Sequence, residues 1–513
     1  METPMKTALT IDGHSLTLQA VQEVAQTGRK VTLAASVKEP LEKARAVVEN
    51  ALSSGEIVYG VNTGFGYLKN TQIPAEDIRS LQRNLILSHA CGVGQPFARE
   101  QVRAMMLLRA NTLIQGHSGV RPIVVETLLA CLNVGIHPQV PSQGSVGASG
   151  DLAPLSHLVL ALLGEGQVEF RGTLWPAAQA LAEAGIEPLV LEAKEGLALI
   201  NGTQPMSAVA CAVVSGMEKL LDQADLIAAL SIQGALGSFQ AFRKELHQLR
   251  PHPGQLLSAE RIWKAMQNSD IVNSHADCDR VQDAYSFRCA PQVHGASRDS
   301  WNHIRQVVER EINSVTDNPL ILPESNEIIS CGHFHGQPIA LVMDFAAIAL
   351  AELANISERR IERLVNPQLN QGLPAFLTPR EGLHSGFMIA QYTAASLVSE
   401  NKVLAHPASV DSIPTSASQE DHVSMGTIAA RKALQILEQT RQVLAIELLC
   451  ACQALDLRAP IQPSPIAAQV LAQVRTQIPM LEADRYLAPD LEKASKLLAE
   501  GSLLKGLEDW LKA

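Results

Sequence analysis

Aromatic residues and paired cysteines are both scarce in this chain of 513 residues. Phe, Trp and Tyr make up only 4% of the sequence, and none of the eight cysteines forms the CxxC spacing of a zinc site. Their scatter also lacks the framework of a small disulfide-linked domain, so we expect reduced thiols, most of them in the core. Whether one of them is a reactive surface cysteine stays an open question, because thiol reactivity depends on exposure and local charge, which the sequence does not show. The cysteines stand at positions 91, 131, 211, 278, 289, 331, 450 and 452.

Positive charge and long uninterrupted apolar runs are also missing. The 41 basic and 52 acidic residues give a net charge of -11 and no basic stripe, so nucleic acid is not an expected partner. The first 18 residues alternate charged and apolar side chains without the apolar core of a secretory signal, so we expect a cytoplasmic protein. The most apolar run, residues 339–356, contains Asp344 and Glu352, which favours a buried bundle helix over a membrane span.

The chain changes character near residue 205. Residues 1–205 mix glycine turns and moderate helices with short β-like pieces at 31–36 and 56–66. From 206 onward, apolar residues recur at helical spacing, as in 206–230 and 428–455. We therefore predict a mainly α protein with a smaller mixed domain, 1–205, followed by a long-helix bundle, 206–513. Loops rich in proline and glycine should carry the site, and they lie at 249–254, 316–327, 372–382 and 406–419.

The segment PSQGSVGASGDLAPLSH, residues 141–157, contains an unusual tripeptide, Ala148-Ser149-Gly150. If the Gly150 nitrogen attacks the Ala148 carbonyl carbon, a five-membered ring closes, and loss of water from Ser149 leaves an electrophilic methylene. Glycine allows the close backbone approach, serine supplies the hydroxyl, and alanine adds no bulk. The plainer interpretation is a helix entry with Ser149 or Asp151 as the N-cap.

GSVGASGDLAPLSH resembles the signature of the aromatic amino acid ammonia-lyase family, whose Ala-Ser-Gly forms 4-methylideneimidazol-5-one (MIO). The resemblance continues in order at 59–66 (YGVNTGFG), 83–94 (RNLILSHACGVG), 200–204 (INGTQ), 282–295 (QDAYSFRCAPQVHG), 331–336 (CGHFHG) and 418–426 (SQEDHVSMG). It implies an autocatalytic MIO from Ala148, Ser149 and Gly150, with no external cofactor and no metal. It also implies a fumarase/aspartase-like helical fold and a homotetramer with shared active sites.

The resemblance assigns a catalytic role to Tyr59, which would remove the substrate β-proton and needs a lowered pKa to do so. The glycines around it also resemble a phosphate loop, but the Gly-Lys-Ser/Thr ending is absent. Arg288 would bind the α-carboxylate through its planar fork. Tyr285 is also assigned to the catalytic residues. Gln282 and Tyr285 precede Arg288 at three-residue spacing, so on a helix all three would share one face toward the ligand. A surface salt bridge and ordinary helix packing remain the plainer alternatives for this group.

Two further positions match the family pattern near the prosthetic ring. Asn201 corresponds to an asparagine that hydrogen-bonds the substrate carboxylate and the prosthetic carbonyl, although an Asn-Gly pair is also a common turn. Phe334 corresponds to an aromatic wall beside the ring, although a single phenylalanine is more often a core residue. His333 and His335 flank it at the spacing of a metal pair, but the sequence offers no third ligand at fixed spacing.

The resemblance also points to the substrate. Histidine-specific members carry Ser-His where this chain has Ser88-His89, and a polar imidazole there can hydrogen-bond a polar substrate ring. Glu420 and Met388, where phenylalanine-type members carry glutamine and lysine, agree. The implied reaction is the removal of ammonia from L-histidine to give trans-urocanate, the first step of histidine degradation. His333 and Ser418 differ from the residues usual at these positions in the histidine enzymes. The sequence therefore does not determine the charge environment near Glu420 and the prosthetic ring.

Three alternatives remain. A tyrosine or phenylalanine lyase, or an aminomutase, would use the same prosthetic group. A helical scaffold or ligand-binding protein would keep the fold without the ring, and a fumarase-like lyase would use a serine base. The sequence also leaves open whether the ring captures the substrate at its amine or at its imidazole.

Overall fold

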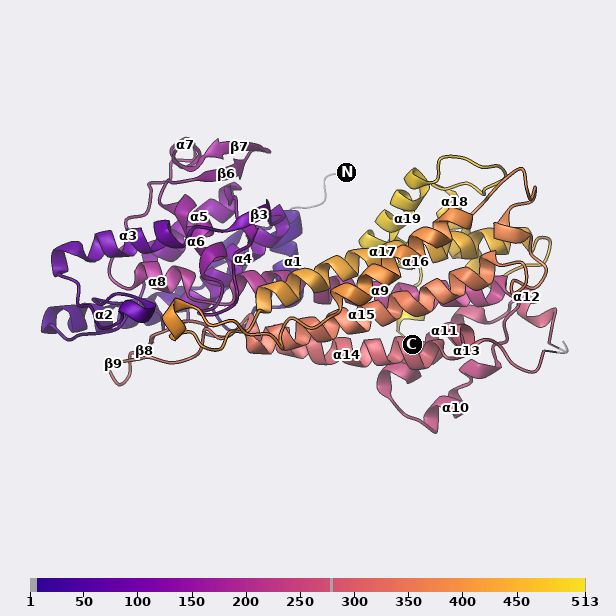
Figure 1. The fold of residues 1–513 in the computed structure, drawn as a ribbon, viewed down its shortest axis with the longest axis horizontal. Coiled ribbons are helices and arrows are strands. Elements are labelled where there is room, and N and C mark those ends of the chain that lie inside the picture. The colour runs from indigo at the N-terminus through magenta and orange to yellow at the C-terminus, as the bar shows by residue number, and fades with distance from the viewer. Residues whose placement is uncertain (1–6, 277–279, 513) are drawn as a thin grey trace. The chain divides into compact units, whose positions relative to one another are not determined.

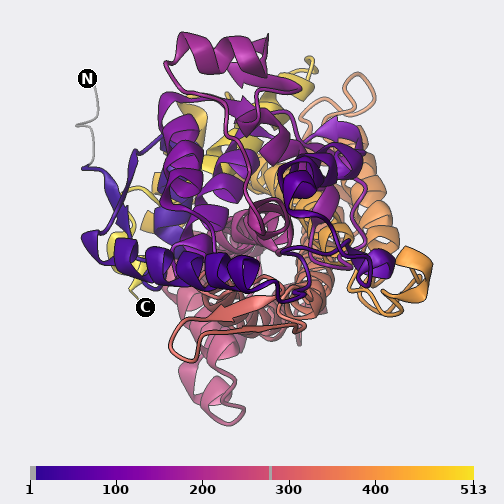
Figure 2. The same cartoon turned by 90° about the vertical axis from the view of Figure 1, so that its left-hand side faces the viewer.

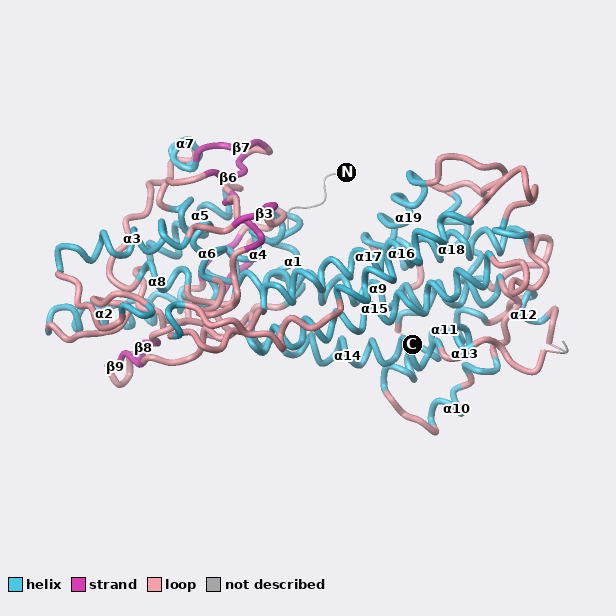
Figure 3. Tube along the Cα trace, in the orientation of Figure 1, coloured by secondary structure: helices cyan, strands magenta, loops and turns pink. Residues whose placement is uncertain are grey.

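The computed structural model describes residues 7–276 and 280–512 and confirms the mainly α prediction. Long helices alternate with loops, and the strands are short pieces of two to four residues (Figure 3). The chain forms two compact units, each assembled from separated stretches. Unit 1 contains Met1–Ala212, Arg305–Asp344 and Pro407–Arg431, and unit 2 contains Val213–Ile304, Phe345–His406 and Lys432–Ala513. The sequence-based division between residues 205 and 206 stays a prediction.

Unit 1 combines helices with four small sheets among the described residues (Figure 1). Strand β1 (Leu9–Ile11) pairs with β2 (Val31–Leu33), β3 (Val93–Pro96) with β5 (Pro141–Gln143), and β6 (Gln167–Phe170) with both β4 (His137–Pro138) and β7 (Thr173–Pro176). Its helices are α1 (Leu18–Thr27), α2 (Lys38–Ser54), α3 (Ile78–His89), α4 (Arg99–Leu113), α5 (Pro122–Val134), α6 (Leu152–Leu162), α7 (Ala177–Glu183) and α8 (Glu195–Ile200).

A hairpin of β8 (Leu320–Leu322) and β9 (Glu327–Ile329) packs against α2, and Figure 2 shows it beside that indigo helix. Ala44 and Val48 of α2 are fully buried with Val61 and Ile321 in one apolar cluster. Because Val61 belongs to the loop that carries Tyr59, this cluster fixes the base of that loop.

Unit 2 consists of helices and loops, and none of the named strands lies among its described residues. Four long helices each contribute residues to both units: α9 (Gln204–Gly234), α14 (Ala290–Glu311), α15 (Gln337–Val365) and α17 (Gly426–Leu457). The others in unit 2 are α10 (Lys244–Gln248), α11 (Pro253–Met266), α12 (Asp270–Asn273), α13 (Tyr285–Arg288), α16 (Met388–Leu404), α18 (Pro465–Arg475), α19 (Ala488–Glu500) and α20 (Glu508–Leu511). The helical periods at 206–230 and 428–455 are confirmed, since they fall within α9 and α17.

The β-like segment at 56–66 was predicted wrongly, because it folds into consecutive turns instead of a strand. The Asn62 side chain accepts a hydrogen bond from the Val58 nitrogen and donates one to the Glu56 carbonyl, each at 2.8 Å. Such local side-chain bonds satisfy the backbone groups that a sheet would need. At 31–36 the prediction is confirmed only for residues 31–33, which form β2.

Two described helical segments, Glu195–Gly234 and Gln337–Val365, are long and apolar enough to cross a membrane by length and composition. Their most apolar windows are 94% and 67% buried inside the protein, as expected of core helices. Asp344 in α15 is itself buried, and one of its carboxylate oxygens accepts a hydrogen bond from the Ser409 nitrogen at 2.6 Å.

The cysteines that the structure describes are free thiols. Four of them are buried, at positions 131, 211, 450 and 452, and burial raises the pKa of Cys131 to about 12. Cys289 and Cys331 are half-buried, whereas Cys91 is exposed. Cys278 lies outside the described residues.

Candidate active site

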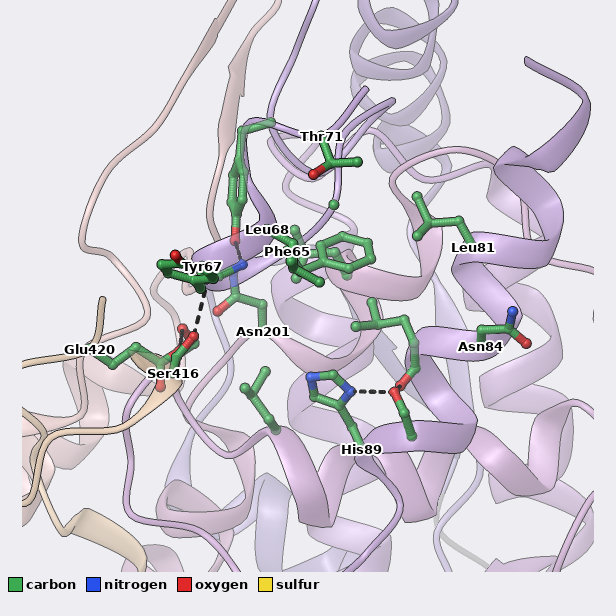
Figure 4. Close-up of a pocket in the computed structure, with 18 of the residues that line it drawn as sticks. Phe65, Tyr67, Leu68, Thr71, Leu81, Asn84, His89, Asn201, Ser416 and Glu420 are labelled. Atoms are coloured by element: carbon green, nitrogen blue, oxygen red, sulfur yellow. Dashed lines mark hydrogen bonds between the residues drawn. The ribbon is translucent and has the colours of Figure 1, made fainter. Parts of the chain in front are cut away.

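A cavity of 720 Å³ in unit 1 brings together six of the predicted site residues. They come from the turn after α2, the end of α3, the loop before α6, the end of α8 and the loop before α17. Figure 4 shows His89, Asn201 and Glu420 around this cavity. The six are Tyr59, Ser88, His89, Ser149, Asn201 and Glu420.

The Ala-Ser-Gly loop has a conformation that only glycine fits. Gly150 has a φ of +69°, and a Cβ there would lie 2.3 Å from the carbonyl oxygen of Gly202. The next residue, Asp151, donates its backbone N–H to that same oxygen at 2.8 Å. Backbone therefore packs directly on backbone beside Ser149, which is the close approach that the ring-forming interpretation requires.

Asp151 begins α6, but its side chain does not cap that helix. Its fully buried carboxylate accepts hydrogen bonds from the Ser145 hydroxyl at 2.6 Å, the Met206 nitrogen at 2.9 Å and the Thr427 hydroxyl. Burial raises the pKa of Asp151, and these three donors oppose that rise. The carboxylate therefore ties the loop to the starts of α9 and α17. The segment is also a helix entry with Asp151 at the N-cap position, as the plainer interpretation predicted, but without a capping side-chain bond.

Ser149 and Glu420 are directly linked. The Ser149 hydroxyl donates to Oε1 of Glu420 at 3.2 Å, and the Thr415 hydroxyl donates to Oε2 at 2.6 Å. Each oxygen of the Glu420 carboxylate therefore has one hydroxyl donor.

Tyr59 departs from the expected electrostatics. Its hydroxyl accepts a hydrogen bond from the Gly66 nitrogen at 3.3 Å. Burial raises the pKa of Tyr59, the negative charge of Glu420 raises it further, and the Gly66 bond lowers it. The lowered pKa that Tyr59 would need as a base is therefore not found in the single chain. The cavity lining that the structure describes contains no lysine or arginine whose charge would lower it.

Ser88 and His89 are the last two residues of α3, and both line the cavity. The Ser88 hydroxyl donates to the Leu85 carbonyl at 3.1 Å and lies 3.0 Å from Nδ1 of His89. Burial lowers the pKa of His89 below its ordinary value, which favours the neutral form of its ring.

Asn201 follows α8 and is 2% exposed. Its Nδ2 donates to the Asn318 carbonyl at 2.8 Å, whereas its buried Oδ1 has no hydrogen-bond partner. A buried amide oxygen without a donor is costly, so this atom is suited to a group bound in the cavity.

A buried ion pair supports Asn201, and no motif predicted it, although Asp317 lies in the predicted loop at 316–327. Lys194 donates to Oδ2 of Asp317 at 2.8 Å, and both side chains are fully buried. Oδ1 of Asp317 accepts the Asn318 backbone N–H at 2.7 Å, which helps to fix the position of the residue whose carbonyl accepts the Asn201 hydrogen bond.

Four predicted site residues belong to unit 2, and none of them lines the cavity of Ser149. Gln282 lies in the loop before the four-residue helix α13, so its predicted place on one helical face with Tyr285 and Arg288 is wrong. The Arg288 guanidinium lies 4.6 Å from the centre of the Tyr285 ring, which is 71% exposed. Gln282 and Arg288 line a separate cavity of 290 Å³, and Met388 is the first residue of α16.

Phe334 precedes α15 in unit 1, where it is half-buried and does not line the Ser149 cavity. Next to it, Nε2 of His335 lies 3.4 Å from Nδ1 of His422, with the two rings stacked. Across residues 7–276 and 280–512, no group of three or more His, Cys, Asp or Glu side chains could hold a metal ion.

The family model of aromatic amino acid lyases matches residues 16–476. The chain belongs to the aromatic amino acid lyase family. The family predicted from the sequence is thereby confirmed, and so is the assignment to the carbon-nitrogen lyases.

Relatives and solved structures of this family cover nearly the whole chain. The histidine ammonia-lyase of Gloeobacter violaceus is 56% identical over 98% of this chain and 97% of its own length. That of Natranaerobius thermophilus is 54% identical over 97% and 98%. The crystal structure of histidine ammonia-lyase from Trypanosoma cruzi aligns with a TM-score of 0.91 at 43% identity, covering 98% of this chain and 96% of that one. The tyrosine aminomutase of Streptomyces globisporus aligns with a TM-score of 0.93 at 41% identity, covering 98% and 99%. The helical fold expected from the family resemblance is thus confirmed.

In this family member, Lys194→Met is expected to lower the free energy of unfolding of unit 1 by about 3–5 kcal/mol, because it leaves the Asp317 carboxylate buried and unpaired. Urea unfolding followed by circular dichroism measures the loss. Lys43→Met is the matched control, since Lys43 pairs with Glu39 on the surface and its loss should change stability far less. An equal effect of the two substitutions would contradict the assignment of Lys194 and Asp317 as a structural pair.

Proposed function

We propose that this chain is a histidine ammonia-lyase, which converts L-histidine to trans-urocanate and ammonia in the cytoplasm. The observation that carries the proposal is the presence of His89 and Glu420 in the cavity that holds Ser149 and Tyr59. An imidazole and a carboxylate can both hydrogen-bond an imidazole substrate, whereas a wholly apolar wall would leave its nitrogens unpaired. Curated relatives named histidine ammonia-lyase, at 51–56% identity, support the same substrate.

The prosthetic group would be MIO, built from Ala148-Ser149-Gly150. The Gly150 nitrogen would bond to the Ala148 carbonyl carbon, whose oxygen would leave as water with the N–H hydrogens of Gly150 and Ser149. The Ser149 hydroxyl would leave with the α-hydrogen of Ser149 as a second water. The residues fit this group, because the positive φ of Gly150 brings the backbones together beside Ser149. Oδ1 of Asn201, which lacks a donor, would accept from the amino group of the substrate. MIO supplies an electron-poor methylene that activates the substrate for loss of ammonia.

Tyr59 would take the β-proton, and its raised pKa in the isolated chain indicates that a cation must come from elsewhere. We propose a homotetramer in which neighbouring copies complete each cavity. Arg288 would bind the α-carboxylate and favour the Tyr59 phenolate, because a nearby positive charge lowers a phenol pKa. The exposed face of Tyr285 supports this arrangement. The other residues proposed to join it are Gln282, Phe334 and Met388.

The test is the initial rate of ammonia release from L-histidine, L-tyrosine and L-phenylalanine. We expect fast release from L-histidine and at least about 100-fold slower release from the other two, because neither ring offers nitrogens to His89 and Glu420. Faster release from L-tyrosine or L-phenylalanine would contradict the substrate assignment. Because a tyrosine aminomutase shares the fold at a TM-score of 0.93, the products of L-tyrosine should also be examined for a β-amino acid.

A further inference from the structure

Arg109 in α4 is a fully buried arginine that does not line the cavity of the candidate active site. Its Nη1 donates to Oε1 of Gln204 at 2.8 Å and to the Thr316 carbonyl at 3.1 Å, and its Nη2 donates to the Ala198 carbonyl. All three acceptors are neutral oxygens. Burial lowers the pKa of Arg109 to about 10 and the charge of Asp317 opposes this shift, so the guanidinium is a cation at neutral pH. Burying a charge among neutral partners is costly, which indicates that Arg109 positions the groups around it.

Arg109 and two of its acceptors pack around Gly202. A Cβ at Gly202 would lie 2.3 Å from Nη1 of Arg109 and 2.9 Å from the Thr316 carbonyl oxygen. The backbone of Gly202 is in turn packed on Gly150, where a Cβ would lie 2.5 Å from the carbonyl carbon of Gly202 and 2.8 Å from its nitrogen. Gly202 therefore contacts both the guanidinium and Gly150, with no room for a side chain at either glycine.

The tripeptide Ala148-Ser149-Gly150 is held at both of its ends. Before it, the Ser424 hydroxyl donates to the Gly147 carbonyl at 3.2 Å. After it, the Asp151 nitrogen donates to the Gly202 carbonyl at 2.8 Å. The tripeptide is thus fixed on one side by the loop before α17 and on the other by Gly202, so the placement of Gly202 affects how freely the tripeptide can move.

We propose that Arg109 is a positioning residue for the formation of the prosthetic ring. It holds Gly202 against Gly150 and so keeps the Gly150 nitrogen close to the Ala148 carbonyl carbon that it must reach. This rests on the proposed function, since it concerns the origin of the ring. The new N–C bond releases the Ala148 oxygen as water with the N–H hydrogens of residues 149 and 150, and the Ser149 hydroxyl and α-hydrogen leave as a second water. The rate of such a reaction within one chain depends on how closely the two groups are held.

The test compares Arg109→Lys with the natural chain. Lysine keeps the charge but has a single nitrogen, which cannot reproduce the planar fork that reaches three acceptors. Each chain is made by cell-free synthesis and sampled at intervals. Intact-mass spectrometry gives the fraction that has lost two waters, and limited proteolysis gives the fraction that has folded. We expect the variant to fold but to form the ring at least about tenfold more slowly, because a small misplacement of reacting groups costs up to about 10²-fold in rate.

Arg360→Lys is the matched control. Arg360 is also fully buried, but it lies in unit 2, and its hydrogen-bond partners are Ser286, His294 and Glu447. This substitution should lower the free energy of unfolding, because it disturbs a buried ion pair, and should leave the rate of the two-water loss unchanged.

Thr203→Val is a milder second variant, which keeps the proposal testable if Arg109→Lys does not fold. The Thr203 hydroxyl donates to Oε1 of the half-buried Glu311 at 2.5 Å. Valine has a similar shape but no hydroxyl, so it removes one support of the turn that carries Gly202. A folded Thr203→Val chain should also form the ring more slowly than the natural chain.

Two results would overturn the proposal: ring formation by folded Arg109→Lys at the natural rate, and equal slowing by Arg360→Lys, which would attribute the loss to general destabilisation. If Arg109→Lys does not fold, ring formation by Thr203→Val at the natural rate would overturn it as well. Failure of the proposed prosthetic group is distinguishable, because the natural chain itself would then show no loss of two waters.

Discussion

Ser149→Ala is expected to yield a folded protein whose ammonia release from L-histidine is at least about 10³-fold slower than that of the natural chain. Without the hydroxyl, no water can be lost at residue 149 and no methylene can form. Intact-mass spectrometry should find the natural chain lighter than its sequence by two waters, whereas the variant lacks that full deficit. The effect is large because no other described group in the cavity is an electrophile.

The control for this result is Ser53→Ala, which removes an exposed hydroxyl near the end of α2 and should leave the mass deficit and the rate unchanged. Gly150→Ala should also prevent ring closure, because its Cβ would meet the Gly202 carbonyl oxygen at 2.3 Å. Ammonia release that is indifferent to Ser149 would mean that this protein does not use the ring.

Tyr59→Phe is expected to lower kcat by about 10²–10⁴-fold while the mass deficit of the prosthetic ring is retained, because the variant lacks only the base. The pH dependence should identify the group. Burial and Glu420 hold the pKa of Tyr59 above its ordinary value, so the phenolate fraction grows as pH rises. The kcat/KM of the natural chain should therefore increase with pH, and the residual rate of the variant should lack this increase.

Tyr67→Phe supplies the comparison, since it removes a second phenol that lines the same cavity but is 67% exposed. We expect it to change kcat by less than about tenfold and to leave the pH profile intact. Equal losses in the two variants, or an unchanged pH profile for Tyr59→Phe, would contradict the role of Tyr59 as the base.

Much of the fold could be predicted because helical periodicity is a local property. The apolar repeats at 206–230 and 428–455 lie within α9 and α17, where those faces are buried. The segment at 56–66 has the composition of a strand, but the Asn62 side chain bonds to the backbone of Val58 and Glu56, both before it, and stabilises turns. Such a competition depends on side-chain geometry, which composition does not reveal.

Part of the candidate site could likewise be predicted from the sequence, and part could not. Tyr59, His89, Ser149, Asn201 and Glu420 were predicted from motifs, and the structure brings them to one cavity. The support of Asn201 by Lys194 and Asp317 could not be predicted, because these two residues are 123 positions apart and neither belongs to a recognised motif. The direction of the Tyr59 pKa shift was also missed, since burial depends on the whole fold.

The sequence by itself determined the chemistry that adjacent residues can perform. Ala148, Ser149 and Gly150 are consecutive, so their capacity to cyclise and lose water follows from covalent connectivity, and the family follows from motifs in order along the chain. Only the tertiary structure decided which groups meet that tripeptide. Glu420 bonds to Ser149 across 271 positions, and Asn201 bonds to the Asn318 carbonyl across 117. Such pairings depend on packing and on the balance of donors and acceptors in a buried cavity, which exist only once the chain has folded.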